Sequence, residues 1–247
     1  MTTPYLLEVN NVGMQFGGLK ALSDINIRVR AGEFMGIIGP NGAGKTTFFH
    51  AISGVLPPTS GEVLIGGQSM KNRQAQAFCR AGVARTFQTP RVFGEMTARE
   101  NVRFALSFGR SATAPKGRSS LVIDEVMQAV GVDDVANEIA GALPPARQRQ
   151  LEIAMALATS PRLLLLDEVA AGLTEGEVED VARLIARLRT EYNLTVVWIE
   201  HAVKTLMAAV ERVAVLNFGQ LLADGTPAEI AANPKVIDAY LGAEVQS

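Results

Sequence analysis

A glycine-rich segment starting at Gly39 has the residue types and spacing of a phosphate-binding loop. It matches the pattern G-x-x-x-x-G-K-[ST], which ends at Lys45 and Thr46. Glycines let consecutive backbone N–H groups turn toward one anion, and the start of a helix adds positive partial charge. We expect Lys45 to bridge the β- and γ-phosphates of a nucleotide and Thr46 to coordinate Mg²⁺. The expected nucleotide-binding residues are Gly39, Pro40, Asn41, Gly42, Ala43, Gly44, Lys45, Thr46 and Thr47.

The alternative for this segment is a chance glycine turn with an exposed lysine. At average residue usage the pattern arises in roughly one chain in a hundred of this length. Here an apolar strand-like run, 34–38, precedes the loop and a helical-looking segment, 47–52, follows it. Because strand, loop and helix come in the required order, the sequence favours a phosphate site.

Two adjacent carboxylates, Asp167 and Glu168, follow the apolar run 163–166. Open α/β sheets bind their ligands at the carboxyl ends of strands. We expect Asp167 to hold Mg²⁺ through water, and Glu168 to accept a proton from, or polarise, the water that attacks the γ-phosphate. Two solvated acids after a buried strand would be the preferred interpretation alone. The phosphate loop shifts the balance toward a catalytic pair.

The elements that must position these residues alternate along the chain. Buried strands are predicted at 34–38, 163–166, 194–199 and 213–216. A crossover helix is predicted by the apolar spacing of Val178, Val181, Ala182 and Ile185. This alternation is typical of a mostly parallel sheet covered by helices on both faces.

The middle third of the chain has a second helical pattern. Its apolar positions are Ile123, Val126, Met127 and Val130. Gly131 suits a left-handed cap at the end of this helix. The preceding stretch from Ser107 to Ser120 is rich in Ser, Gly, Arg and Ala and predicts a surface linker.

Composition limits the classes of partner. In 247 residues, 23 Lys and Arg nearly balance 25 Asp and Glu, so no overall field would draw the chain onto nucleic acid or an anionic bilayer. The single cysteine, Cys79, is interpreted as a buried, inert thiol in a reducing compartment. The N-terminus lacks a secretory pattern, and apolar runs such as 196–199 are far shorter than the ~20 residues of a membrane-spanning helix. We expect a cytoplasmic protein.

Several further motifs carry a family resemblance. They are Phe16-Gly-Gly-Leu19-Lys-Ala-Leu22, Ala84-Arg-Thr-Phe-Gln88, Glu100-Asn-Val102, Ile199-Glu-His201 and the tail from Ala232 to Gly242. Together with the phosphate loop, they resemble the nucleotide-binding domains of ABC transporters, and among these the ATPases of branched-chain amino-acid importers. The resemblance implies an α/β fold: a P-loop NTPase (RecA-like) core with an N-terminal antiparallel β region and an inserted helical subdomain. It implies a single domain over 1–247, with the core at 1–90 and 157–247 and the helical subdomain at 91–156.

The resemblance also assigns roles to three residues. Phe16 takes the position that stacks on adenine, with a plain core phenylalanine as the alternative. Gln88 takes the place of the glutamine that joins the helical subdomain to the core and reaches Mg²⁺ and the attacking water. His201 takes the position whose imidazole contacts the γ-phosphate, although an isolated histidine is usually a surface or core residue. The expected catalytic residues are thus Lys45, Gln88, Glu168 and His201.

The chain departs from the family at the signature motif, Leu-Ser-Gly-Gly-Gln. Here Leu143-Pro144-Pro145-Ala146-Arg147 stands in its place. The prolines have no N–H to donate to an anion, although proline is accepted in the first turn of a helix. Arg147 is considered as a compensating positive charge. Val169 replaces the usual proline and Thr174 the usual aspartate, which alters the expected dimer interface.

These features predict the ATP-binding subunit of an ABC importer that takes up a small polar solute, branched-chain amino acids or related compounds. ABC domains bind each ATP between the phosphate loop of one subunit and the signature helix of the other. We therefore expect a heterodimer with a second ABC ATPase, a homodimer being possible, together with integral-membrane permease subunits and a separate solute-binding protein at the inner face of the plasma membrane. One alternative is a regulatory subunit with weak hydrolysis. Another is a soluble ABC ATPase acting on nucleic acid, which the lack of a basic extension disfavours.

Overall fold

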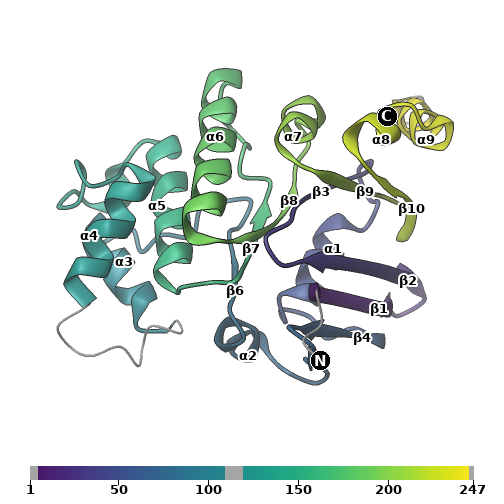
Figure 1. Ribbon diagram of the computed structural model, residues 1–247, viewed down its shortest axis with the longest axis horizontal. Coiled ribbons are helices and arrows are strands. Elements are labelled where there is room, and N and C mark those ends of the chain that lie inside the picture. Colours follow the sequence, from purple (N-terminus) through teal and green to yellow (C-terminus); the bar gives the residue numbers. More distant parts are fainter. Residues whose placement is uncertain (1–4, 109–118, 245–247) are drawn as a thin grey trace.

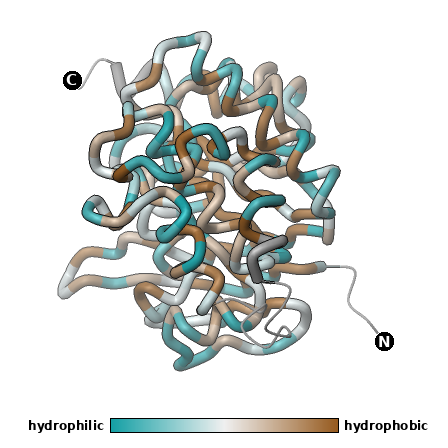
Figure 2. The backbone as a smooth tube through the Cα atoms, turned by 90° about the vertical axis from the view of Figure 1, so that its left-hand side faces the viewer, coloured by the Kyte–Doolittle hydropathy of each residue, from teal (hydrophilic) through white to brown (hydrophobic). Residues whose placement is uncertain are grey.

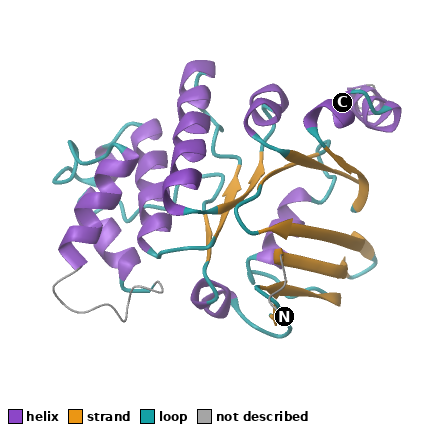
Figure 3. Ribbon diagram, in the orientation of Figure 1, coloured by secondary structure: helices purple, strands orange, loops and turns teal. Residues whose placement is uncertain are grey.

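The computed structural model describes residues 5–108 and 119–244, whose strands form two sheets (Figures 1 and 3). The antiparallel sheet has the order β2-β1-β4-β5, with β1 at Tyr5–Phe16, β2 at Leu19–Arg30, β4 at Ser60–Ile65 and β5 at Gln68–Ser69. The second sheet has the order β10-β9-β3-β8-β7-β6. Its strands are β3 (Phe34–Ile38), β6 (Val83–Arg85), β7 (Leu163–Asp167), β8 (Thr195–Ile199), β9 (Arg212–Asn217) and β10 (Gln220–Gly225). Strands β9, β3, β8, β7 and β6 run parallel, and β10 is antiparallel to β9.

Helices lie on both sides of the parallel sheet (Figure 1). They are α1 (Lys45–Ile52), α2 (Ala75–Arg80), α3 (Ala98–Leu106), α4 (Ser119–Val130), α5 (Pro145–Ala158), α6 (Glu175–Tyr192), α7 (Val203–Ala209), α8 (Pro227–Ala231) and α9 (Pro234–Glu244), with a short 3₁₀ helix, η2, at Ala140–Ala142. Helices α3, α4 and α5 pack against one another at one end of the molecule. Along the periphery, hydrophilic and hydrophobic residues alternate (Figure 2).

Alternate residues of the parallel strands enter two separate apolar cores. In β3, Phe34 and Ile38 face a core formed with the helices α3 to α7, whereas Met35 and Ile37 face a core formed with α1 and the antiparallel sheet. Successive side chains of a strand point to opposite faces, so a strand buried on both faces must be apolar throughout. This explains the uninterrupted apolar runs in the sequence.

The predicted elements around the site are confirmed. The four predicted strands correspond to β3, β7, β8 and β9, and the predicted crossover helix is α6. Thr174 caps α6: its hydroxyl accepts from the Glu177 N–H, and the Glu177 carboxylate accepts from the Thr174 N–H. Gly131, at φ 77°, ends α4 as expected, because its N–H and that of Val132 both donate to the Met127 carbonyl.

Two predictions about the periphery need comment. Of the predicted linker Ser107 to Ser120, residues 109–118 lie outside the described residues, and its end is wrong because Ser119 and Ser120 already belong to α4. Cys79 is only partly buried, since Phe78 is the residue of α2 that enters the core. Burial nevertheless raises the pKa of the Cys79 thiol, with the Arg80 charge acting in the opposite direction, which agrees with an unreactive cysteine.

A bilayer-spanning helix would have to be both long and apolar, and within residues 5–108 and 119–244 no helix meets both conditions.

Candidate functional site

The phosphate loop joins the end of β3 to the start of α1, as its pattern predicts. A β-carbon at Gly39 would lie 2.2 Å from the Leu216 carbonyl oxygen, so only glycine lets the loop pass this close to β9. Gly44 has a φ of 97°, a left-handed conformation that glycine adopts without strain, and forms the N-cap of α1. The backbone conformation of the loop therefore depends on its glycines. Pro40, Asn41 and Gly42 lie in the loop between these two positions.

Lys45 rests on the loop itself. Its Nζ donates to the Gly39 carbonyl at 2.7 Å and to the Pro40 carbonyl at 3.1 Å. Burial lowers the pKa of Lys45, and the nearby Glu168 carboxylate acts in the opposite direction. The ammonium is thus held beside the space that phosphates would take, with Glu168 close enough to influence it.

The N–H groups at the start of α1 are suited to bind an anion. In the first turn, the N–H groups of Lys45, Thr46 and Thr47 have no helical carbonyl to bind, and the Thr46 side chain is exposed. The Ala43 N–H instead donates to the Pro40 carbonyl at 3.1 Å, and the Ala43 side chain is buried in the core. As the structure stands, Ala43 shapes the loop, and its N–H is not directed to an anion.

Asp167 is the last residue of β7 and is buried. Its backbone N–H donates to the Thr86 hydroxyl at 3.2 Å, and its Oδ2 accepts from the Arg85 guanidinium at 2.5 Å. Burial and the Arg85 charge lower the pKa of His50, one turn after Thr46 on α1, and the Asp167 carboxylate acts in the opposite direction. The carboxylate therefore faces the part of α1 that carries the Thr46 hydroxyl.

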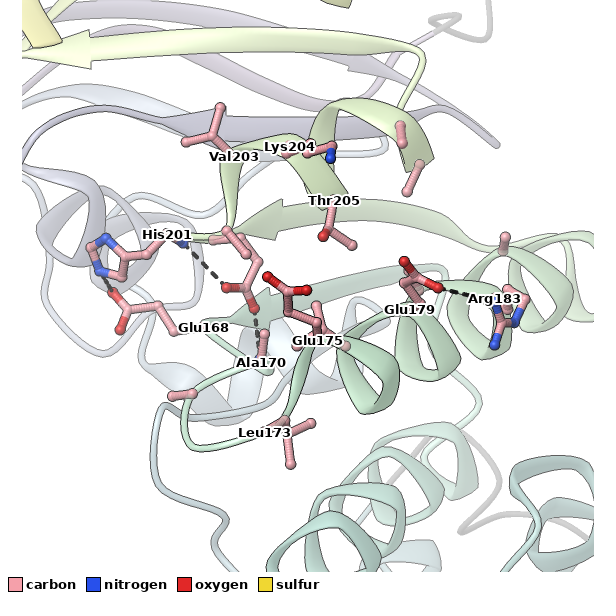
Figure 4. A pocket seen from close by; sticks show the side chains of 18 residues that line it. Glu168, Ala170, Leu173, Glu175, Glu179, Arg183, His201, Val203, Lys204 and Thr205 are labelled. Carbon is pink, nitrogen blue, oxygen red and sulfur yellow. Dashed lines mark hydrogen bonds and ion pairs between the residues drawn. The ribbon is translucent and has the colours of Figure 1, made fainter.

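Glu168 and His201 meet at the ends of neighbouring strands. Glu168 Oε1 lies 2.8 Å from His201 Nε2 (Figure 4). Glu168 follows β7 with a φ of 48°, a left-handed conformation that is unfavourable for a side chain of this size. Its N–H donates to the Ile199 carbonyl of β8 at 2.9 Å. The strained turn directs the Glu168 carboxylate toward the exposed imidazole, and strain of this kind is concentrated at functional sites.

Glu200 lies beside the candidate site, and sequence reasoning missed it. Its buried carboxylate accepts from the Ala170 N–H at 2.7 Å, the Trp198 indole N–H at 3.2 Å and the His201 N–H at 3.2 Å. Burial raises the pKa of Glu200 and these hydrogen bonds oppose the shift. Glu200 therefore joins the segment after Glu168 to the backbone of His201. The signal available in the sequence was an acid directly after the apolar run 196–199.

Two of the three residues assigned by resemblance, Phe16 and Gln88, reach the surface. Phe16 ends β1 with 46% of its surface exposed, which excludes the alternative of a core phenylalanine. Gln88 is also exposed, and its backbone carbonyl accepts from Arg149 Nη2 at 2.6 Å. Both side chains are accessible to a ligand.

A buried ion pair on α5, Arg149 with Glu152, holds the segment that carries Gln88, and sequence reasoning missed it. Arg149 Nη1 lies 2.7 Å from Glu152 Oε2, with side-chain exposures of 2% and 5%. The guanidinium also donates to the carbonyls of Phe87 and Gln88, and Glu152 Oε1 accepts from the N–H groups of Phe87 and Arg91 at 3.1 Å each. We call this pair and its four backbone bonds the α5 bracket. It fixes the chain after β6 to α5. We call α3, α4 and α5, which pack against one another, the helical layer.

The signature position forms the start of α5. Pro144 is the N-cap and Pro145 the first helical residue, so the helix forms despite the prolines, as expected. The idea of a compensating charge is not supported: Arg147 donates to Asp134 Oδ2 at 2.7 Å and to the Gly131 carbonyl, which directs the guanidinium into the helical layer. Its charge is already paired.

Other departures from the family have local explanations. Val169, which replaces proline, is fully buried in the core that the parallel sheet forms with the helices α3 to α7. Thr174, which replaces aspartate, is the N-cap of α6.

A hollow of about 850 Å³ lies between α6 and α7 and is lined by Glu168, Glu200 and His201 (Figure 4), while the phosphate loop lies outside it.

The donors suit a magnesium ion that is shared with a nucleotide. Among the described residues there is no group of three or more His, Cys, Asp or Glu side chains that could hold a metal alone. Mg²⁺ is commonly bound by one or two carboxylates together with substrate phosphates and waters. Asp167 and the exposed Thr46 hydroxyl fit this mode.

Comparison with known proteins agrees with this geometry. The family described as "ABC transporter" matches residues 22–171, and that described as "Branched-chain amino acid ATP-binding cassette transporter" matches residues 220–246. The chain is 42% identical to the high-affinity branched-chain amino acid transport ATP-binding protein BraF of Pseudomonas aeruginosa and 41% identical to LivG of Escherichia coli K12, covering 96% of this chain and 98% of each relative. It is 30% identical to the lipopolysaccharide export system ATP-binding protein LptB of E. coli K12, with 96% and 97% covered.

Solved structures of ATP-binding cassettes have the same fold. A nucleotide-free cassette from an ABC transporter superposes with a TM-score of 0.85 at 26% identity, covering 96% of this chain and 98% of that one. A cassette in its ADP conformation gives 0.84 at 26% identity, covering 97% and 100%. The expected P-loop NTPase fold is therefore confirmed, and the chain belongs to the ABC transporter family as one of its nucleotide-binding, ATP-hydrolysing subunits.

Proposed function

We propose that the chain energises an ABC importer for branched-chain amino acids or related small polar solutes. Its 42% and 41% identity to BraF and LivG support import of this solute class over the export function of the 30% identical LptB. The match of residues 220–246 to the branched-chain family supports the same assignment. In this proposal the chain acts at the cytoplasmic face of the inner membrane on separate permease subunits, and a separate solute-binding protein supplies the cargo.

The observation that carries the proposed chemistry is the Glu168–His201 contact of 2.8 Å beside the phosphate loop. Glu168 would accept a proton from the attacking water, and His201 would contact the γ-phosphate while holding that water in line. Lys45 would move from the loop carbonyls to the β- and γ-phosphates. Phe16 would stack on adenine, since its exposed ring offers a face to any base.

Thr46, Asp167 and Gln88 would hold Mg²⁺, and Gln88 would also contact the attacking water. When bound, Mg²⁺ would neutralise charge that develops on the phosphates.

Gln88 is exposed at the junction of the core and the helical layer. We infer that residues 91–156 form a subdomain that moves with Gln88 relative to the core, and that a permease segment bound there follows this motion.

The dimer is proposed to be a heterodimer. Pro144 and Pro145 offer no N–H, and Arg147 is paired with Asp134, so this chain is poorly equipped to bind the nucleotide of its partner. A second ABC ATPase with an intact signature would complete the site built here from Lys45, Asp167, Glu168 and His201. A homodimer remains the alternative assembly.

The test measures ATP hydrolysis by the chain alone and mixed with candidate second subunits, then solute uptake by the complex in proteoliposomes. Activity should be low alone and appear in the mixture. Glu168→Gln should lower both hydrolysis and uptake about 10²–10⁴-fold, the usual effect of losing a general base, whereas Glu191→Gln on the exposed end of α6 should change neither. Full activity of the chain alone would contradict the heterodimer, and uptake that survives Glu168→Gln would favour the regulatory alternative, which the relatives do not favour.

A further inference from the structure

Arg85, at the end of β6, pairs with the proposed magnesium ligand. Its Nη2 lies 2.5 Å from Asp167 Oδ2, and each side chain is 6% exposed. Because the pair is largely shielded from water, its attraction is far stronger than that of a surface ion pair. One carboxylate oxygen of Asp167 is therefore occupied by a cation that belongs to the protein.

Contacts with two other segments hold Arg85 in this position. Its Nη1 donates to the Ser53 hydroxyl at 3.0 Å, at the end of α1. The guanidinium carbon lies 5.6 Å from the ring centre of Phe49 on α1 and 5.1 Å from that of Phe87, distances at which aromatic rings attract a cation. The charge is thus fixed between the phosphate-loop helix, Asp167 and the segment leading to Gln88.

The hydrogen bonding of Arg85 is incomplete. Its Nε is buried and has no hydrogen-bond partner in the described part of the chain. A buried donor without an acceptor carries the cost of its lost hydration. The guanidinium therefore forgoes one hydrogen bond while it remains against Asp167.

We propose that Arg85 is a positioning residue that acts as an internal counter-cation: it holds Asp167 in the nucleotide-free protein, and Mg²⁺ must compete with it for the carboxylate. The inference rests on the proposed function, in which Asp167 serves Mg²⁺. Without nucleotide, the positive charge of Arg85 disfavours a divalent cation at the site. With ATP bound, the negative phosphates offset that charge, so metal binding depends on nucleotide.

The experiment measures Mn²⁺ binding by electron paramagnetic resonance, on nucleotide-free protein and in the presence of ATP. Arg85→Gln and Arg85→Met remove the charge, and the methionine variant keeps an apolar contact with the two rings. Both should bind Mn²⁺ at least about tenfold more tightly without nucleotide, because a full positive charge is removed from beside the carboxylate. The gain should be smaller with ATP.

Two further variants isolate the charge effect. Arg85→Lys keeps the charge and should bind Mn²⁺ like the wild type, and Arg73→Gln, an exposed arginine, should change nothing. Unchanged or weaker binding in both uncharged variants would overturn the inference, as would Arg85→Lys binding as tightly as they do.

Asp167→Asn separates this inference from the proposed metal site. If Asp167→Asn weakens Mn²⁺ binding in the presence of ATP but the uncharged Arg85 variants bind no more tightly, only the role of Arg85 fails. If Asp167→Asn leaves Mn²⁺ binding unaltered in the presence of ATP, the metal assignment fails, and the inference with it.

Discussion

Disruption of the α5 bracket should cost both stability and catalysis, by different amounts in different variants. Arg149→Met removes the ion pair to Glu152 and the bonds to the Phe87 and Gln88 carbonyls. It leaves a buried carboxylate that only two backbone N–H groups compensate, and such a loss costs about 3–5 kcal/mol. Glu152→Gln leaves Arg149 with two carbonyls and should cost about 1–3 kcal/mol.

The double variant Arg149→Met/Glu152→Gln should be less destabilised than the sum of the single variants, because no unpaired charge stays buried. We expect a coupling energy of at least about 1.5 kcal/mol in a double-mutant cycle measured by urea unfolding. The matched control is the exposed pair Arg183 and Asp180 on α6, at 68% and 70% exposure, whose coupling should stay within about 0–1 kcal/mol. Additivity of the bracket variants to within about 0.5 kcal/mol would refute this reasoning.

The same double variant should separate nucleotide affinity from turnover. The bracket does not touch the phosphate loop, so the affinity for ATP should change little. Release of the carbonyl of Gln88 should loosen its side chain and lower kcat by about 10-fold or more, since positioning errors near 1 Å can cost about 10²-fold. Adding Gln88→Ala to the double variant should then have little further effect. An unchanged kcat in the complete complex would show that the bracket serves stability alone.

Two further predictions concern single side chains. Phe16→Ala should weaken nucleotide binding about 5- to 150-fold, the equivalent of one base–aromatic stack of about 1–3 kcal/mol, whereas Phe16→Tyr should not; equal weakening by the two variants, measured by fluorescent-nucleotide titration, would contradict stacking. Glu200→Gln should flatten the pH dependence of stability. Burial raises the pKa of Glu200 in the folded protein above its ordinary value of 4.5. Ionisation of Glu200 therefore lowers the stability of the wild type as the pH rises from 4.5 through the folded-state pKa. The Tm of the variant minus that of the wild type, from calorimetry, should therefore increase with pH, and a constant difference would contradict the assignment.

The parts of the site that lie next to one another along the chain were predictable from the sequence. Gly39 and Gly44 are needed for backbone geometry, so the pattern that contains them predicts a loop of known shape. Asp167 and Glu168 follow the uninterrupted apolar run 163–166, which places them at the carboxyl end of β7. His201 was placed at the site by the family resemblance, and the parallel pairing of β7 with β8 explains why it lies beside Glu168.

Contacts between distant segments were not predictable in this way. Arg85 and Asp167 are separated by 82 positions, and Arg149 and Phe87 by 62. Periodicity shows that α5 has buried positions but not which polar side chain reaches which backbone group. Arg147 is an example: its charge suggested an anion contact, and in the structure it pairs with Asp134 of another segment.

The start and the middle of α5 therefore differ in their consequences for function. At its start, Pro144 and Pro145 remove donors that an anion would need, while the helix itself remains intact. In its middle, the buried ion pair of Arg149 and Glu152 binds backbone atoms of the segment that carries Gln88. A buried ion pair contributes little stability compared with apolar residues of similar size. What this pair does provide is a fixed geometry between the helical layer and Gln88. In the proposed heterodimer, the chain would therefore bind its partner's nucleotide weakly at the start of α5, while the middle of the same helix would link its own site to the other helices.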